Sequence, residues 1–275
     1  MSRAAIFADV LRQRRPNTDN QAMLNMKIAN RFLKHLTYAW KRHGWRLFGP
    51  LLWHNIVYQI DRLRGRRGSP EITELDRKLG IDTYNIEATA LMEINGDNLV
   101  RGYRYQPVTE TAFRASIEDL QIDISRYTFI DYGSGKGRAL LLATEFPFRR
   151  IIGIEYAREL HNIAVTNLIR AKTHLPRTNR VQCIWEDATQ YEPPMEPLVC
   201  FLYNPFNANV IERLLNKLSN SLVASPRDIV ITYVNPVHRD AIDNHPDITL
   251  LREGTSTTIY RLNLPKISDR RSTRP

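Results

Sequence analysis

A glycine-rich loop and two carboxylates are the residues best suited to chemistry in this 275-residue chain. A short apolar run, Tyr127–Tyr132, predicts a strand that ends in the loop Asp131-Tyr-Gly-Ser-Gly-Lys-Gly137. Glycines let a backbone pass close to a ligand and turn sharply into a following helix. Glu155 ends the next predicted strand, where a carboxylate can accept hydrogen bonds from both hydroxyls of a ribose. The spacing predicts a cofactor site of the nucleotide type.

Two classes of cofactor share this layout, and the loop residues favour one of them. A dinucleotide loop needs a small third residue so that helix and strand pack closely, and the bulky Arg138 stands at that position. The carboxylate of Asp131 is unfavourable beside a pyrophosphate and favourable beside the amino group of S-adenosylmethionine. The loop therefore favours the methyl donor. Taken alone, a glycine loop is also compatible with a plain strand-to-helix turn.

Strands and helices alternate from about residue 125 onwards. Alternation of this kind predicts a mostly parallel sheet with helices on both faces, and Glu253-Gly254 predicts a turn that closes a final antiparallel hairpin. The predicted strands are Tyr127–Tyr132, Ile151–Glu155, Val181–Trp185, Leu198–Tyr203, Asp228–Val234, Ile248–Arg252 and Thr257–Leu264, and the predicted helices are Arg138–Thr144, Ala157–Ala171 and Asn207–Leu222.

Two further polar segments follow predicted strands at the same edge of the sheet. Asp187-Ala188 follows the third strand, where a side chain can reach an adenine amino group, although a solvated turn is the alternative. Tyr203-Asn-Pro-Phe206 follows the fourth strand and brings an amide, a proline carbonyl and an aromatic ring. The proline is also compatible with a simple strand end.

From about Leu75 to Leu264 the sequence resembles a bacterial class I S-adenosylmethionine-dependent methyltransferase. The resemblance lies in Phe129-Ile-Asp-Tyr-Gly-Ser-Gly-Lys-Gly-Arg138, Ile151-Ile-Gly-Ile-Glu155, Asp187-Ala188 and Asn204-Pro-Phe206. It implies an α/β, Rossmann-like class I methyltransferase fold with a seven-stranded sheet. It also implies that Asp131 and the glycines lie at the methionine moiety of the cofactor, Glu155 at the ribose and Asp187 at the adenine.

Two shorter resemblances concern the methyl acceptor. Asn204-Pro-Phe206 resembles the Asn/Asp-Pro-Pro-Tyr/Phe motif of amino-directed methyltransferases, with one proline in place of two. Tyr105-Gln-Pro-Val-Thr109 resembles a loop of Dot1-like protein-lysine methyltransferases that closes over the cofactor. The predicted catalytic residues are Asn204, Pro205 and Phe206, and the predicted cofactor-binding residues are Tyr105, Thr109, Asp131, Gly133, Ser134, Gly135, Gly137, Glu155, Tyr156, Asp187, Ala188 and Asn204.

Three other residues near the site receive structural interpretations. His161 and His238 are candidate bases. We interpret His161 as a surface residue, and His238 follows Asn235-Pro236 beyond the fifth parallel strand, where an approach to the pocket is the alternative. Lys136 is interpreted as a solvent-facing loop lysine, with contact to the cofactor carboxylate as the alternative.

The leading hypothesis is an enzyme that methylates nitrogen on a lysine-like protein side chain or another amine. Neutral amines need a free lone pair, and the Asn204 amide oxygen with the Pro205 carbonyl would orient it by accepting from the N–H groups. The alternatives are a methyltransferase acting on RNA or DNA and a non-catalytic module that binds S-adenosylmethionine.

The positive charge is concentrated near the N-terminus. The chain has a net charge of +10, and residues 1–70 hold 14 Lys/Arg against 3 Asp/Glu while the remainder holds 25 against 26. We predict a basic tail with amphipathic helices at residues 1–70, a methyltransferase domain at 71–265 and a disordered basic tail at 266–275. The first segment is interpreted as a lid on the domain, an interfacial helix on anionic membranes, or a basic arm that recruits RNA, DNA or an acidic protein partner.

Composition excludes several classes of protein. Cys183 and Cys200 lie in apolar runs and predict reduced core residues, and no Cys/His group has zinc spacing, so no metal is expected. The best apolar stretch, Leu47–Ile60, is too short to span a membrane, and no signal peptide is visible. We expect a cytoplasmic protein, with peripheral membrane attachment as the alternative.

Overall fold

The computed structural model describes residues 73–84, 107–203 and 206–265, all within the second of the two units into which the chain divides, Ile60–Pro275. The helices predicted between residues 21 and 64, and the terminal tails, lie outside the described residues. The proposed domain boundaries therefore stay predictions.

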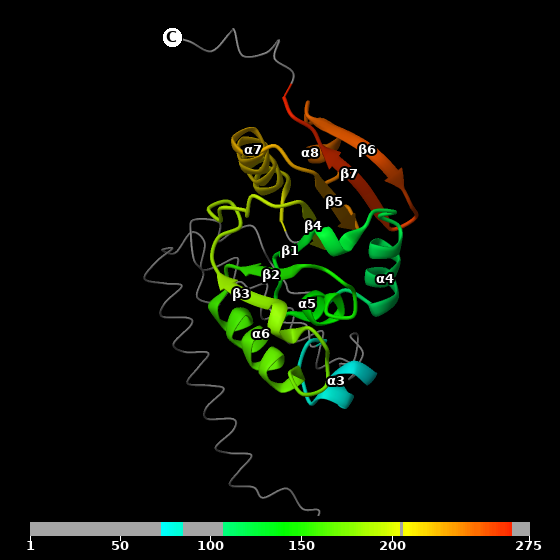
Figure 1. Cartoon of the computed structure of the whole chain (residues 1–275), viewed down its shortest axis with the longest axis vertical. Helices are drawn as coiled ribbons and strands as arrows, with labels where there is room; N and C mark the ends of the chain where they lie inside the picture. Colours follow the sequence, from blue (N-terminus) through cyan, green and yellow to red (C-terminus); the bar gives the residue numbers. More distant parts are fainter. Residues whose placement is uncertain (1–72, 85–106, 204–205, 266–275) are drawn as a thin grey trace, which may run out of the picture. The chain divides into compact units, whose positions relative to one another are not determined.

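Seven strands form one sheet in the order β3-β2-β1-β4-β5-β7-β6 (Figure 1). Strands β1 to β5 are parallel to one another, and β7 is antiparallel to both β5 and β6. This confirms the predicted mostly parallel sheet with a C-terminal hairpin. The strands are β1 (Thr128–Tyr132), β2 (Arg150–Glu155), β3 (Val181–Trp185), β4 (Leu198–Tyr203), β5 (Ile229–Val234), β6 (Ile248–Glu253) and β7 (Thr257–Leu262).

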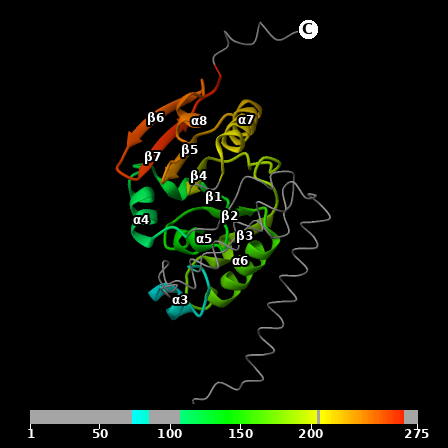
Figure 2. The same ribbon diagram turned by 180° about the vertical axis from the view of Figure 1, so that it is seen from behind.

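Helices cover both faces of the sheet, as opposite views of the molecule show (Figures 1 and 2). Three of them, α4 (Glu110–Glu118), α5 (Arg138–Ala143) and α6 (Arg158–Ala171), lie together on one face. The other face carries α7 (Ala208–Ala224) and α8 (Asp240–Asp243). The short helix α3 (Glu74–Leu79) packs beside α5 and α6 through Leu79 and Ile81.

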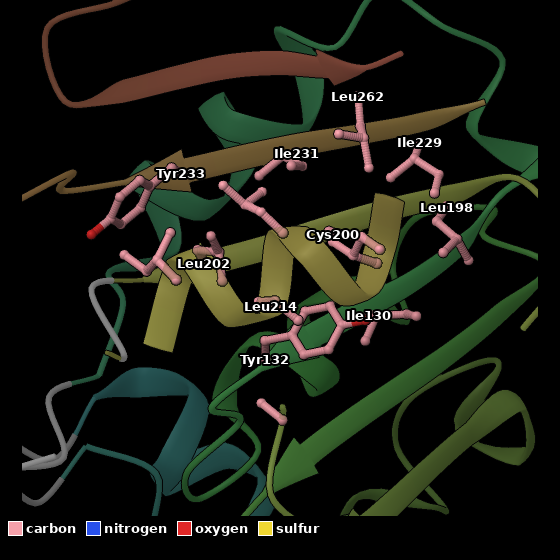
Figure 3. Packing of buried hydrophobic residues seen from close by; sticks show 14 of the residues in the cluster. Ile130, Tyr132, Leu198, Cys200, Leu202, Leu214, Ile229, Ile231, Tyr233 and Leu262 are labelled. Atoms are coloured by element: carbon pink, nitrogen blue, oxygen red, sulfur yellow. The ribbon is translucent and has the colours of Figure 1, made fainter. Parts of the chain in front are cut away.

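Each face of the sheet has its own hydrophobic core, because successive side chains of a strand point to opposite faces. The core under α7 contains Tyr132, Cys200 and Tyr233 and is seen from close by in Figure 3. The opposite core is rich in phenylalanine, with the rings of Phe113, Phe129, Phe148 and Phe201 in mutual contact. Burial on both sides explains why β1, β4 and β5 are nearly continuous apolar runs in the sequence.

The predicted element boundaries agree with the structure to within two residues. The helix predicted over 207–222 is α7, and Asn207 caps its start by accepting from the Val210 N–H at 3.1 Å. The predicted turn at Glu253-Gly254 is confirmed, since the Gly254 N–H donates to the Thr257 carbonyl. The sequence reading did not assign α3, α4 or α8, which have only four to nine residues each.

Candidate functional site

The glycine loop leaves the carboxyl end of β1 and enters α5 through three left-handed residues. Gly133, Gly135 and Gly137 have φ angles of +88°, +52° and +81°, a region that residues with a side chain rarely adopt. The N–H groups of Gly133 and Ser134 both donate to the Ile154 carbonyl of β2, at 2.9 and 3.0 Å. The loop is therefore fixed to the neighbouring strand.

The lack of a side chain at Gly153 of β2 leaves room for Ser134 of the loop and Leu140 of α5. The sequence did not lead us to predict this role. A Cβ atom at Gly153 would lie 2.4 Å from Cδ1 of Leu140 and 2.8 Å from Oγ of Ser134. Real Cβ atoms do not approach neighbours so closely, so any larger residue would push the loop or α5 away from β2. The glycine in Ile-Gly-Ile was the available signal, since a glycine inside a buried strand often marks a close approach.

Glu155 holds the middle of the loop through backbone contacts. One of its carboxyl oxygens accepts from the Gly135 N–H at 2.7 Å, and the other accepts from the Ala157 N–H at 2.8 Å. The side chain is only 3% exposed. Burial raises its pKa to about 7, against the opposing effect of the backbone donors. Glu155 thus links the loop to the start of α6, in addition to the ribose contact that the sequence predicts.

Asp131 has the most unusual environment in the site. Its side chain is 4% exposed, and among the described residues no group donates a hydrogen bond to its carboxyl. Burial, followed by the charge of nearby Glu155, raises the pKa of Asp131 to about 8. Cys183 lies close enough that the charge of Asp131 adds to burial in raising the thiol pKa. A buried carboxyl that faces a second carboxyl without a donor provides a favourable environment for a cationic ligand.

Asp187 and Ala188 lie at the carboxyl end of β3, on the adenine side of the predicted site. Asp187 is 6% exposed, and one carboxyl oxygen accepts from both the N–H and the hydroxyl of Thr189 at 2.8 Å. Ala188 is buried in the core under α7. Asp187 therefore shapes a turn, and its predicted contact with adenine stays a prediction.

Tyr156 joins the same edge of the sheet. Its carbonyl accepts from the indole N–H of Trp185 at 3.0 Å, and the Arg158 guanidinium lies 4.9 Å from the centre of the Trp185 ring. The Glu186 N–H donates to the Glu155 carbonyl at 3.1 Å, which continues the β2–β3 pairing into the loops. These contacts bring Glu155, Tyr156 and the Asp187 turn side by side.

Lys136 and Arg138 have environments that the sequence reading did not foresee. The interpretation of Lys136 as solvent-facing is wrong, because its side chain is fully buried and its ammonium lies 3.0 Å from the Asp82 carboxylate. Arg138 is 4% exposed and donates to the Val108 carbonyl at 2.8 Å and to Oγ1 of Thr83 at 2.9 Å. Asp82, Val108 and Thr83 lie 30 to 55 residues from Lys136 and Arg138 in the sequence, so no local sequence pattern predicts these contacts.

The acceptor motif is described only in part. Asn204 and Pro205 lie outside the described residues, as does Tyr105. Phe206 is half-buried and packs against the core under α7. Thr109 is exposed, and its hydroxyl caps α4 by accepting from the Ala112 N–H. Because β4 pairs with β1, the end of β4 at Tyr203 lies at the same edge as the glycine loop.

The two candidate bases, His161 and His238, are both half-buried. His161 is half-buried in α6, and burial lowers its pKa, which favours the neutral ring. Its Nδ1 has no hydrogen-bond partner among the described residues. His238 is half-buried after β5, and its N–H donates to the Tyr233 hydroxyl at 3.4 Å. In the described part of the chain, neither histidine forms a hydrogen bond or ion pair with Asp131 or Glu155.

No group of three or more His, Cys, Asp or Glu side chains that could hold a metal ion occurs within residues 73–84, 107–203 and 206–265. Cys183 and Cys200 are free, as predicted. No helix in these ranges is long and apolar enough to cross a membrane.

The position of β7 decides the fold family. It lies between β5 and β6 and runs against both, in a sheet whose first five strands are parallel. The chain has the class I methyltransferase fold. No family model and no curated protein matches its sequence.

Solved structures of similar fold are distant in sequence. An RNA methyltransferase from Salinibacter ruber in complex with S-adenosyl-L-homocysteine has 20% identity and a TM-score of 0.43, with 58% of this chain and 94% of that chain covered. TrmN from Thermus thermophilus has 11% identity and a TM-score of 0.44, with coverages of 56% and 49%. Magnesium protoporphyrin IX methyltransferase from Synechocystis PCC 6803 with bound SAM has 11% identity and a TM-score of 0.40, with coverages of 56% and 77%.

Proposed function

We propose that this chain is an S-adenosylmethionine-dependent methyltransferase. The observation that carries the proposal is the carboxyl of Asp131, which is buried beside Glu155 without a hydrogen-bond donor among the described residues. Two buried carboxyls repel each other when both are ionised, and a cation between or beside them removes that penalty. The amino group of S-adenosylmethionine is such a cation, and its sulfonium adds a second positive charge.

The same residues disfavour a dinucleotide. A pyrophosphate would bring negative charge next to Asp131 and Glu155, which burial already makes costly to ionise. The position that a dinucleotide loop reserves for a small residue holds Arg138, whose side chain is buried and bonded to Val108 and Thr83. Arg138 therefore does not supply the small residue that a dinucleotide loop has at this position.

We assign cofactor binding to the carboxyl edge of β1, β2 and β3. Asp131 would receive the amino group, the loop glycines would leave room for the methionine moiety, and Glu155 would face the ribose. When bound, S-adenosylmethionine would supply an electrophilic methyl group. The proposed cofactor-binding residues are Tyr105, Thr109, Asp131, Gly133, Ser134, Gly135, Gly137, Glu155, Tyr156, Asp187, Ala188 and Asn204.

We further propose that the acceptor is nitrogen, on a lysine-like protein side chain or another amine. Support comes from Asn204-Pro205-Phe206, which directly follows β4, the strand paired with β1. An amide oxygen and a carbonyl can accept from the N–H groups of an amine and so orient its lone pair. Phe206 is held by packing against the core under α7 and can limit the positions open to the acceptor.

Binding and turnover can be tested separately on the full chain. Calorimetric titration should give saturable binding of S-adenosylmethionine and S-adenosylhomocysteine and none of NAD. Incubation with methyl-labelled S-adenosylmethionine and a cell extract should then label protein or a small amine. Label in nucleic acid would overturn the nitrogen-on-protein assignment, and tight binding without label would indicate a non-catalytic module.

Asn204→Ala is the variant that addresses the acceptor. We expect turnover to fall by about 10²-fold or more, because the amine loses the group that orients it. The cofactor dissociation constant should rise by less than about threefold, because the other proposed cofactor contacts stay in place. Gln190→Ala, an exposed residue beyond the Asp187 turn, provides a matched control with unchanged turnover. Unchanged turnover in Asn204→Ala would contradict the assignment.

A further inference from the structure

The segment Thr73–Tyr84, here called the strap, contacts the second half of the glycine loop. The Lys136 ammonium donates to the two carboxyl oxygens of Asp82 at 3.1 and 3.0 Å. Lys136 is fully buried, whereas 40% of the Asp82 side chain is exposed. A buried ammonium is costly unless it is paired, so the ion pair ties the loop to the strap.

Asn167 of α6 joins the strap and the loop a second time. Its amide oxygen accepts from the Asp82 N–H at 3.1 Å. Its amide nitrogen donates to the Asp82 carbonyl at 2.8 Å and to the Lys136 carbonyl at 3.0 Å. The side chain is only 1% exposed. One buried amide therefore satisfies the backbone of both segments and fixes their separation.

The loop is consequently held from two sides. Glu155 holds the Gly135 N–H from the β2 side, while Asp82 and Asn167 hold Lys136, the next residue, from the strap side. Gly137 then turns into α5, and a Cβ there would lie 3.1 Å from Cβ of Ala164. The loop backbone has little freedom between these contacts, and a site that binds by shape depends on such support.

We propose that Asp82, Lys136 and Asn167 are positioning residues of the cofactor site. They hold the glycine loop in its binding conformation, and they act through the loop backbone. This inference rests on the proposed function, since the loop is the proposed site for the methionine moiety. If the strap served stability alone, variants of these residues would lower the unfolding temperature and leave the dissociation constant of the cofactor unchanged.

Arg170 offers a matched control on the same helix. Its guanidinium donates to the Gly80 carbonyl at 2.9 Å, so it binds the strap without touching the glycine loop. Arg170→Ala removes a strap contact of comparable length from the exposed side of α6. The affinity of Arg170→Ala for the cofactor therefore shows what loss of a strap contact does when the contacts of the loop are unchanged.

The test is calorimetric titration of the full chain and its variants with S-adenosylmethionine, with thermal unfolding of each unliganded protein. We expect Asn167→Ala and Asp82→Asn to raise the dissociation constant about tenfold or more, because part of the binding free energy is then used to order the loop. Arg170→Ala should stay within about twofold of the wild type. Asp82→Glu, which keeps the negative charge, should restore most of the affinity.

One further variant guards against failure to fold. Asp82→Asn removes a carboxylate that pairs with the buried Lys136 ammonium, so the double variant Asp82→Asn/Lys136→Met removes both charges of this ion pair. The double variant should fold and should still bind about tenfold more weakly than the wild type.

The outcomes separate the two proposals. A wild type that does not bind S-adenosylmethionine overturns the proposed function. A wild type that binds, with Asn167→Ala and the double variant within twofold of it, overturns the positioning role and leaves the function standing. Equal weakening in Arg170→Ala also overturns the positioning role, because strap docking as a whole would then account for the effect.

Discussion

Two buried aspartates lie near the start of α5, and their surroundings differ. Asp76 of α3 and Asp131 of β1 are both 4% exposed. Asp76 accepts from the N–H groups of Thr83 and Tyr84 at 2.9 and 3.0 Å, and from the Thr83 hydroxyl at 2.5 Å. The Arg138 guanidinium adds a fourth contact at 3.5 Å. Asp131 has no such donor among the described residues.

Asp76 is a hydrogen-bonded structural acid, whereas Asp131 is the acid to which we assign a ligand. Buried polar groups are nearly always hydrogen-bonded, and a satisfied carboxylate such as Asp76 stabilises the segment that surrounds it. An unsatisfied carboxylate destabilises the unliganded fold, so its presence calls for a ligand that compensates it. Asp76 therefore organises the strap, whereas the environment of Asp131 suits the cation that we propose it binds.

Removal of the charge at Asp76 should produce the largest effect on stability. Asp76→Asn leaves Arg138 buried without a carboxylate. The N–H groups of Thr83 and Tyr84 then have a neutral amide in place of the carboxylate, which is a weaker acceptor. We expect the free energy of unfolding to fall by about 3 kcal/mol. Denaturant unfolding measures it, with Asp123→Asn as the control, because Asp123 is exposed and its oxygen would still cap the turn at Ser125. A loss below about 1 kcal/mol would contradict the structural role.

The same substitution at Asp131 should have the opposite sign. The pKa of Asp131 is raised in the folded state, from 3.8 to about 8, so the folded protein holds its proton more tightly than the unfolded chain. Stability therefore falls as pH rises from about 4 to about 8 and then levels off. At pH 8, Asp131→Asn should raise the unfolding temperature of the unliganded protein by roughly 2–4 °C, about 1 kcal/mol. A lower unfolding temperature at pH 8 would mean that Asp131 stabilises the fold.

Gly153→Ala should lower stability by less than Asp76→Asn does, and it tests the comparison from the side of the loop. The added methyl group would meet Ser134 and the flexible end of Leu140, so the loop must move while Asp131 itself stays unchanged. We expect a loss of about 1–2 kcal/mol in unfolding free energy, as for an overpacked core. Binding of S-adenosylmethionine should weaken as well, whereas a variant of wild-type affinity would show that the loop tolerates displacement.

The fold could be predicted closely from the sequence, because its signals are local. Apolar runs predict all seven strands, and Asn207 predicts the start of α7. The antiparallel hairpin followed from Glu253-Gly254 between two such runs. The short helices α3, α4 and α8 were missed because one or two turns give too little periodicity to recognise.

The site could be predicted only as far as the local sequence determines it. The loop, Asp131 and Glu155 followed from residue types and spacing. The burial of Lys136 depends on Asp82, which is 54 residues away, and Arg138 depends on Thr83 at a distance of 55 residues. The requirement for Gly153 depends on how α5 packs on β2. Such contacts arise from the assembled fold, and no spacing in the sequence encodes them.

The most direct test of the account is the proton inventory of cofactor binding. Titration of the wild type with S-adenosylmethionine at pH 7, in two buffers of different ionisation enthalpy, counts the protons exchanged. Because the pKa of Asp131 is about 8 without ligand and should fall beside a cation, we predict the release of about one proton. Asp131→Asn should release far less and bind about 10²-fold more weakly. Equal affinity and equal proton release in the two proteins would contradict the assignment of Asp131 to the cationic cofactor.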